Sequence, residues 1–315
     1  MPSKAFALME SIIRSGRANP PADRAADRRA AAEQAAMYRP FPGVRDEAAR
    51  DLRDGSYLMT PDDARDDLVI LYLHGGAFFS GTAGMCRAIG AHLALGTRAR
   101  VVLPEYRLAP EDPYPAGLDD CEAAFEYAAT LAPGVVVAGE SAGANLAMGV
   151  LLRRTARGDT RALAGMLYAG VFDQRKQRYE SGSWVDRAEA DLALGGADDS
   201  MTTHYLGGHP AEDPLVSPVL ADLTGLPPLF IQVSSAERLL DDSLALAAGA
   251  ARAGVHVEME VWPHMTHAWQ IAAGFLPEAT EAAERSAAFV NRVAAGRIVD
   301  GAALLGGPAT LEELL

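Results

Sequence analysis

The sequence contains few cysteines, since its 315 residues include only Cys86 and Cys121. They lie far apart and no Cys-x-x-Cys pair exists, so the pattern argues against a cysteine-based structural zinc site. A single disulfide between the two residues remains an alternative. The simpler interpretation is that both are buried, reduced thiols in a protein of a reducing compartment, and we expect a cytoplasmic location.

The sequence also lacks a long apolar run and an excess of basic residues. No run approaches the roughly 18 apolar residues that span a bilayer, and the short apolar patch at 6–9 ends at Glu10 before a secretory signal could form. Asp and Glu outnumber Lys and Arg by 42 to 28, which gives a net charge of -14. Such a surface repels phosphate backbones and anionic headgroups, so we expect no nucleic-acid partner and no membrane insertion.

Apolar residues, in contrast, are abundant and follow an alternating pattern of strands and helices from about residue 66 to 296. The expected strands are 68–73, 99–103, 135–138, 164–169, 229–233 and 255–261, with an earlier pair of edge strands within 50–60. The expected helices are 83–96, 117–131, 143–157, 241–253 and 277–294. This alternation indicates an α/β fold with a mostly parallel central sheet flanked by helices, and ligands bind at the carboxyl ends of the strands of such sheets.

Two segments interrupt this alternation. Residues 1–45 are helical and then proline-rich in character, and residues 174–212 are polar and rich in Gly and Asp. An insertion at the functional edge of a sheet often forms a cap. We therefore expect a core of 46–173 and 213–297, a helical cap formed by 1–45 and 174–212, and a tail at 298–315 of unknown role.

The segment GESAG at 139–143 has the pattern G-x-S-x-G. It follows the apolar run at 135–138 and precedes a helical stretch at 144–157, which is the strand-turn-helix context that a nucleophile elbow requires. The helix that starts there points its amides and the positive end of its dipole at the serine. An ordinary Gly/Ser turn is the alternative, but the context favours Ser141 as the nucleophile of an α/β-hydrolase fold.

The segment HGGAFF at 74–79 follows the strand expected at 68–73. Glycines there let backbone N–H groups approach a ligand closely, and such amides can stabilise the oxyanion of a tetrahedral intermediate. The candidate residues of this oxyanion hole are Gly75, Gly76, Ala77 and Ala142. The amides of Gly76 and Ala77 are the favoured donors of the loop, while Gly75 shapes the turn and His74 anchors it.

The chain order of the chemical groups also fits this fold, in which the serine is followed by an acid and then by a histidine. With these blocks in view, the sequence resembles the hormone-sensitive lipase family of esterases, also called the bacterial family IV esterases. The matching blocks are HGGAFF (74–79), PEYRLAPEDPYPA (104–116), GESAGANLA (139–147), DPLVSPVL (213–220), AERLLDD (236–242) and HAW (267–269). The resemblance covers about 200 residues and implies an α/β-hydrolase fold.

The family pattern for the acid is an acidic residue, any residue and then Leu, with a second acid four positions on. Glu237 matches the first position, where Asp is usual, and Asp241 and Asp242 remain alternatives. The family pattern for the base is His, any residue and then an aromatic. It selects His267 over His264. The resemblance thus implies a catalytic triad of Ser141, His267 and Glu237.

The resemblance implies hydrolysis of a small-molecule carboxylic ester through an acyl-enzyme, with no metal and no organic cofactor. A cap limits the room for long chains, so short- to medium-chain acyl esters are the expected substrates. Phe78, Phe79 and Tyr38 are candidate pocket residues, although aromatic side chains there are equally well explained as core.

Two other functions remain open. An amidase or arylformamidase would use the same triad, and a non-catalytic small-molecule receptor would keep the fold alone. The resemblance also raises a homodimer through the edge strand at 255–261, which the residues themselves do not show.

Overall fold

The computed structural model describes residues 3–18, 23–194 and 197–298. Its centre is one eight-stranded sheet whose strands follow the order β1-β2-β4-β3-β5-β6-β7-β8. Strand β2 runs antiparallel to both of its neighbours, and every other neighbouring pair is parallel. The strands are β1 (Val44–Ala48), β2 (Tyr57–Pro61), β3 (Leu68–Leu73), β4 (Arg100–Leu103), β5 (Gly134–Glu140), β6 (Ala162–Tyr168), β7 (Leu229–Ser234) and β8 (Val257–Trp262).

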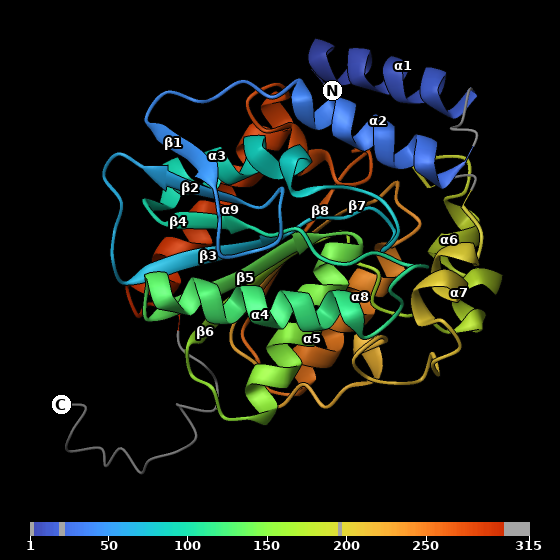
Figure 1. The fold of residues 1–315 in the computed structure, drawn as a ribbon. Helices are drawn as coiled ribbons and strands as arrows, with labels where there is room; N and C mark the ends of the chain where they lie inside the picture. Colours follow the sequence, from blue (N-terminus) through green and yellow to red (C-terminus); the bar gives the residue numbers. More distant parts are fainter. Residues whose placement is uncertain (1–2, 19–22, 195–196, 299–315) are drawn as a thin grey trace.

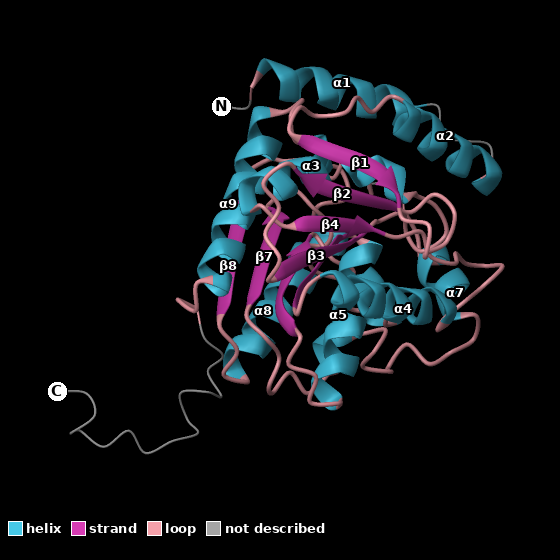
Figure 2. Ribbon diagram, turned by 60° about the vertical axis from the view of Figure 1, so that its left-hand side comes forward, coloured by secondary structure: helices cyan, strands magenta, loops and turns pink. Residues whose placement is uncertain are grey.

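Helices cover both faces of the sheet (Figures 1 and 2). The long helices of the core are α3 (Arg87–Thr97), α4 (Ala116–Leu131), α5 (Ala142–Ala156), α8 (Leu240–Arg252) and α9 (Pro277–Ala294). Alternate residues of β3 enter two separate hydrophobic clusters, because successive side chains of a strand point to opposite faces. One cluster contains residues of α4, α5 and α8, and the other contains residues of α3 and α9. All six residues of β3 are therefore buried, as the fully apolar run LVILYL predicts.

The expected strands and helices of the core are confirmed, with shifts of a few residues at their ends. One expectation was wrong: the pair of edge strands does not lie within 50–60. The strands are Val44–Ala48 and Tyr57–Pro61, and the turn between them has Gly55 at φ +92°. The first strand escaped notice because most of its side chains are not buried, so VRDEA carries little apolar pattern.

Two segments lie outside the sheet and its long covering helices. The N-terminal segment forms α1 (Lys4–Ala18) and α2 (Arg24–Ala36), which lie side by side along the top of the molecule in Figure 1. The stretch between β6 and β7 forms the short elements η2 (Lys176–Glu180), α6 (Ser183–Asp186), α7 (Ser200–Leu206) and η3 (Pro218–Leu220). The remaining short helices are η1 (Ala83–Cys86) and η4 (Trp269–Ala272). Of the tail expected at 298–315, residues 299–315 lie outside the described residues.

These two segments, which form the expected cap, also contact each other. The Arg24 guanidinium of α2 lies against the His204 ring of α7, with Nη2 3.0 Å from Nδ1. Arg28, one turn further along α2, donates to the carbonyl of Phe79 at 2.8 Å and pairs with Glu111 at 2.7 Å. The segment before the sheet is thereby joined both to the insertion and to the loop after β3.

Candidate active site

The turn between β5 and α5 holds Ser141 in a conformation that side chains rarely adopt, with φ +56° and ψ -122°. The surrounding glycines make this turn sterically feasible. A Cβ on Gly143 would lie 2.1 Å from the carbonyl oxygen of Leu73, and one on Gly139 would lie 2.5 Å from the oxygen of Gly143. No side chain fits at either distance. The G-x-S-x-G pattern is thus required by the close approach of β3, the elbow and the first turn of α5.

The loop after β3 passes directly beside the serine. A Cβ on Gly75 would lie 3.1 Å from Cβ of Ser141, so this glycine allows the close approach. Its own amide donates to Oε1 of Glu140 at 2.5 Å. Within the described chain, the amides of Gly76, Ala77 and Ala142 have no hydrogen-bond acceptor. These amides are therefore available to donate to a ligand.

Buried side chains hold the loop at 74–79 in place. Gly76, Ala77 and Phe78 have positive φ, so the loop follows a tight, unusual path. His74 is fully buried, stacks on Tyr106 at 4.2 Å between ring centroids, and lies 3.6 Å from Glu105. The Tyr106 hydroxyl donates to the His74 carbonyl at 2.6 Å. His74 therefore anchors the loop.

Glu237 and His267 face each other at the same edge of the sheet. Glu237 follows β7 and His267 follows β8. Strands β5, β6, β7 and β8 lie side by side in this order and are parallel, so their carboxyl ends lie at one edge of the sheet. Ser141 follows β5 at the same edge. Oε1 of Glu237 lies 3.8 Å from Nδ1 of His267, and both side chains are buried, with 1% and 10% exposed. The distance is beyond a hydrogen bond but within the range of a charge pair.

Burial and mutual attraction set the pKa values of this pair. Burial raises the pKa of Glu237 to about 6, although the neighbouring imidazole opposes the rise. Burial lowers the pKa of His267, but the carboxylate of Glu237, with smaller contributions from Asp191 and Glu140, more than offsets this and leaves the pKa raised above its ordinary value. Perturbed pKa values of paired groups are typical of functional sites.

The alternative acids and the alternative base lie elsewhere. Asp241 is exposed and accepts from the amide of Ser183 at 2.7 Å. Asp242 is buried and pairs with Arg178 at 3.1 Å while it accepts from the amides that follow β6. His264 is exposed. Both aspartates thus bind the insertion, and Glu237 is the acid that faces an imidazole.

The three aromatic candidates for the pocket separate into two groups. The Phe78 ring stacks on Tyr205 of α7 at 3.7 Å, and the Phe79 ring lies 5.7 Å from the Arg24 guanidinium, so both meet the cap. Tyr38 instead lies 4.0 Å from the guanidinium of Arg87 and packs with the opposite core cluster. Phe78 and Phe79 belong to the loop beside Ser141, and no contact among the described residues brings Tyr38 to that loop.

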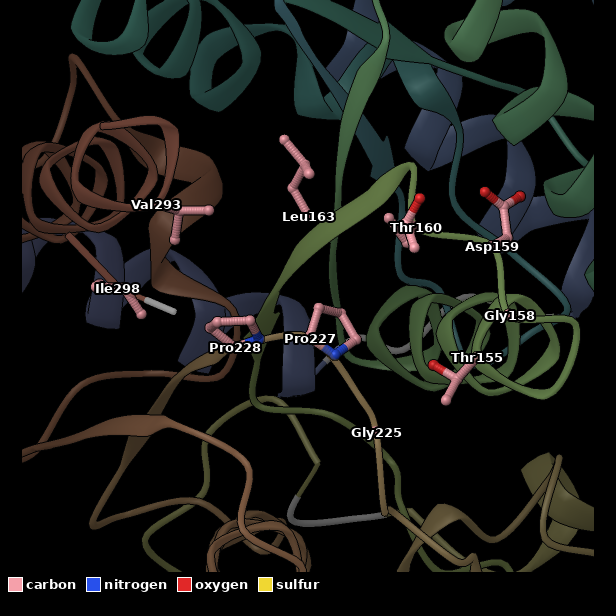
Figure 3. A pocket seen from close by; sticks show the side chains of 11 residues that line it. Thr155, Gly158, Asp159, Thr160, Leu163, Gly225, Pro227, Pro228, Val293 and Ile298 are labelled. Atoms are coloured by element: carbon pink, nitrogen blue, oxygen red, sulfur yellow. The ribbon is translucent and has the colours of Figure 1, made fainter. Parts of the chain in front are cut away.

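Two cavities differ in their relation to this edge. One of about 190 Å³ lies between α1 and the loops before Glu237 and His267, and is lined by Phe6, Leu192, Ala236 and Thr266 among others. A larger one of about 370 Å³ lies at the amino ends of β6 and β7 (Figure 3). Its lining includes Pro227, Pro228, Val293 and Ile298. The cavity therefore lies at the edge of the sheet opposite the carboxyl ends that precede Ser141, Glu237 and His267.

Sequence reasoning missed two charged residues at this edge, Asp191 and Arg238. Asp191 is 2% exposed and lies in the insertion, close enough to raise the pKa of both Glu237 and His267. Arg238 directly follows the acid and is 8% exposed. No sequence signal marks Asp191, because the insertion has no periodicity from which burial could be predicted. The signal for Arg238 is its place beside the acid.

Among the described residues, no group of three or more His, Cys, Asp or Glu side chains is placed to hold a metal ion. No helix in the described ranges is long and apolar enough to cross a bilayer. Both cysteines are buried free thiols, as the sequence predicts.

Comparison with known proteins agrees with the fold. Residues 70–271 match the family described as the alpha/beta hydrolase fold. The chain is 38% identical over 231 residues to an acetyl-hydrolase of Streptomyces hygroscopicus, covering 72% of this chain and 76% of the relative. It is 34% identical over 246 residues to the carboxylesterase NlhH of Mycobacterium tuberculosis, covering 74% and 76%.

Solved structures place the chain more narrowly. The crystal structure of an esterase from the bacterial hormone-sensitive lipase family superposes with a TM-score of 0.85 at 32% sequence identity, covering 93% of this chain and 99% of that one. The chain therefore belongs to the α/β-hydrolase fold family and, within it, to the bacterial hormone-sensitive lipase family of esterases.

Proposed function

We propose that the protein is a serine carboxylesterase that hydrolyses short- to medium-chain acyl esters with Ser141, His267 and Glu237. The observation that carries the proposal is the buried Glu237–His267 pair, 3.8 Å apart, at the sheet edge where Ser141 occupies a strained turn beside Gly75. A buried, charge-paired imidazole beside an activated-serine turn is the arrangement that acyl transfer needs.

The path of the chain after β8 supports the convergence of the three side chains. Strand β8 is the edge strand, three strands away from β5, which is a separation of roughly 14 Å at the usual spacing. The segment after β8 leads to η4, which contacts α3, and α3 packs on β2 and β4 on the far side of β5. We therefore expect a loop that makes this crossing to bring His267 toward the carboxyl end of β5.

The proposed reaction follows from these parts. Nε2 of His267 accepts the Ser141 proton as the serine oxygen attacks the ester carbonyl carbon, and Glu237 stabilises the imidazolium that forms. The free amides of Gly76, Ala77 and Ala142 stabilise the oxyanion, an effect of roughly 3–4 kcal/mol per donor. The imidazolium then gives its proton to the departing alcohol. Water, deprotonated by the same imidazole, attacks the acyl-enzyme and releases the acid and free Ser141.

The cap supports the proposed limit on acyl-chain length. Phe78 is 2% exposed under Tyr205, so the insertion occupies the space directly above the loop beside the serine. One relative is named an acetyl-hydrolase, which acts on a short acyl group. We expect activity to fall steeply as the acyl chain lengthens, because the cap must be displaced to admit more methylene groups.

A panel of p-nitrophenyl esters from acetate to palmitate tests the proposal, with Ser141→Ala as the control. We expect turnover of the short esters and a loss of at least about 10³-fold in the variant. Hydrolysis retained in Ser141→Ala, or no hydrolysis of any ester by the wild type, would rule the proposal out. N-formyl aromatic amines in the same panel distinguish an amidase.

Two finer proposals accompany this one. A homodimer would pair β8 with its copy, because this edge strand has no neighbour on its outer side in the described sheet and Val261 is 45% exposed. Sedimentation velocity of the wild type and of Val261→Lys tests the dimer, with a single monomeric species in both as the contradicting result.

The second finer proposal concerns location. The two buried thiols support a reducing, cytoplasmic compartment.

A further inference from the structure

The turn that carries Glu237 has an unusual distribution of hydrogen bonds. The two carboxylate oxygens of Glu237 and Nδ1 of His267 make no hydrogen bond in the described part of the chain. The acid is therefore not oriented by bonds of its own. Its position depends on the backbone that carries it, which is the short turn from Ser234 to Leu239 between β7 and α8.

That backbone is bound through the next residue, Arg238, to the cap insertion. The Arg238 amide donates to Oδ2 of Asp191 at 2.9 Å, and its carbonyl accepts from the Ser183 hydroxyl at 2.8 Å. Among the described residues of the insertion, its guanidinium donates to three backbone carbonyls. These are the carbonyls of Trp184 at 2.5 Å, Leu194 at 2.8 Å and Ala197 at 2.8 Å.

Asp191 completes the connection from the side of the insertion. Its Oδ1 accepts from the amides of Ala193 at 3.0 Å and Leu194 at 2.8 Å, so it shapes the segment whose carbonyl Arg238 binds. The two residues thus join residues 183–194 and Ala197 to the acid turn, and we call this set of bonds the acid clamp. Charge-assisted bonds of buried groups are stronger than neutral ones, and an irregular segment depends on them to satisfy its backbone.

We propose that the cap insertion positions the catalytic acid, and that Asp191 and Arg238 are positioning residues for the proposed esterase reaction. The clamp fixes where the Glu237 backbone lies, and the long Glu side chain then reaches the imidazole from that fixed point. The insertion thereby contributes to the chemistry as well as covering the site. This inference rests on the proposed function of the triad.

The charge of Asp191 adds a measurable consequence. The groups that face His267 are Glu237 after β7, Asp191 of the insertion and Glu140 beside the serine, and each favours the charged imidazole. On the side of α1, Glu10 and Arg14 line the adjoining cavity with the exposed His264. Removal of the Asp191 charge therefore lowers the pKa of His267, and the acid limb of kcat/KM moves to lower pH because the base must be neutral to act.

The test uses Asp191→Asn and Arg238→Lys, with Asp242→Asn as the matched control. Asp242 is a similarly buried aspartate that accepts two backbone amides, where Asp191 accepts three, and it also binds the insertion, but its partner is Arg178. Asp191→Asn keeps an oxygen for the insertion amides and loses the charge and the bond to the Arg238 amide. Arg238→Lys leaves Asp191 in place and removes the planar fork, so it tests the clamp even if Asp191→Asn fails to fold.

We expect kcat for p-nitrophenyl butyrate to fall about 10–100-fold in both clamp variants with KM within about threefold of wild type, because a misplaced catalytic group costs rate rather than binding. We also expect the acid limb of Asp191→Asn to move to lower pH. A kcat within twofold of wild type in both clamp variants would overturn the inference, as would an equal kcat loss in Asp242→Asn. If the wild type itself shows no Ser141-dependent hydrolysis, the proposed function is wrong.

Discussion

The two halves of the site are held in different ways. The nucleophile half, formed by the Ser141 turn and the loop at 74–79, is fixed by backbone contacts so close that a methyl group on Gly143 would lie 2.1 Å from a carbonyl oxygen. The acid–base half consists of the buried side chains of Glu237 and His267, which lie 3.8 Å apart. Within the described chain, neither carboxylate oxygen of Glu237 nor Nδ1 of His267 makes a hydrogen bond. The first half is part of the core, and in our proposal the cap insertion positions the second.

This comparison teaches that the two halves should fail differently. A change in the nucleophile half disturbs the junction of β3, β5 and α5, and therefore the stability of the whole domain. A change in the acid–base half removes groups that the fold does not need, because burying an unpaired carboxylate is itself unfavourable. Stability and activity should therefore separate between them.

The largest effect is expected for Gly143→Ala. The added methyl group meets the carbonyl oxygen of Leu73, so the elbow must move away from β3, and we expect a loss of several kcal/mol of folding free energy and a Tm lower by about 10 °C or more. Differential scanning calorimetry measures the Tm. Gly158→Asn is the control, because a Cβ there has no atom within 4 Å and Asn tolerates its positive φ. Equal Tm values for both variants would contradict the account of the elbow.

The next largest effect should fall on activity. Glu237→Gln keeps the size of the acid but removes the charge that stabilises the imidazolium, and we expect kcat/KM to fall about 10³–10⁴-fold. The matched control is Asp241→Asn, which we expect to stay within about threefold. A comparable loss in both variants would mean that the wrong carboxylate has been assigned.

The same variant should be more stable than the wild type at alkaline pH. The folded-state pKa of Glu237 is raised from 4.5 to about 6, so the folded state binds the proton more tightly than the unfolded state. The stability linked to this proton is complete below pH 4.5 and is lost as pH rises through about 6. The loss is on the order of 2 kcal/mol. We expect the Tm of Glu237→Gln to exceed that of the wild type more at pH 8 than at pH 4, and the opposite trend would contradict the burial argument.

Part of the fold and of the site could be predicted from the sequence alone. The elbow and the loop at 74–79 could be predicted because their requirements are local: glycine where backbones nearly touch, and a strand before a turn before a helix. The parallel strands were equally readable, since burial on both faces leaves an apolar run such as LVILYL in β3. The placement of Glu237 and His267 after successive late strands followed from the same topology.

The remainder depends on contacts distant in sequence. Strand β1 went unnoticed because an edge strand with mostly exposed side chains has little apolar pattern. Asp191 and Arg238 are 47 residues apart, and only the folded chain brings them together. Tyr38 is a pocket candidate from its place in the N-terminal segment, but its ring packs on the Arg87 guanidinium and against the core cluster that contains α3 and α9.

A smaller effect is expected at the junction of the two halves, at Glu140. Its carboxylate accepts the Gly75 amide, so Glu140→Ala leaves that buried N–H without an acceptor and loosens the loop beside the serine. We expect kcat to fall about 10-fold, while Glu140→Gln, which keeps an acceptor oxygen, stays within about threefold. Steady-state kinetics of the two variants decides between them, and equal losses would point to the charge instead of the hydrogen bond.

The smallest effect is a displacement of the pH profile. His267 must be neutral to accept the serine proton, and its raised pKa places the acid limb of kcat/KM above pH 6.5. A rate profile of p-nitrophenyl butyrate hydrolysis between pH 5 and 9 measures it. A limb centred clearly below the ordinary histidine value would show that burial outweighs the attraction of Glu237.

The convergence of the two halves is tested most directly by a crystal structure of the protein inactivated with an alkyl fluorophosphonate. We predict a covalent bond to Oγ of Ser141, a phosphonyl oxygen within about 3 Å of the amides of Gly76, Ala77 or Ala142, and Nε2 of His267 at hydrogen-bond distance from the adduct. An adduct on another residue, or an imidazole turned away from Ser141 with Glu237 still beside it, would contradict the account.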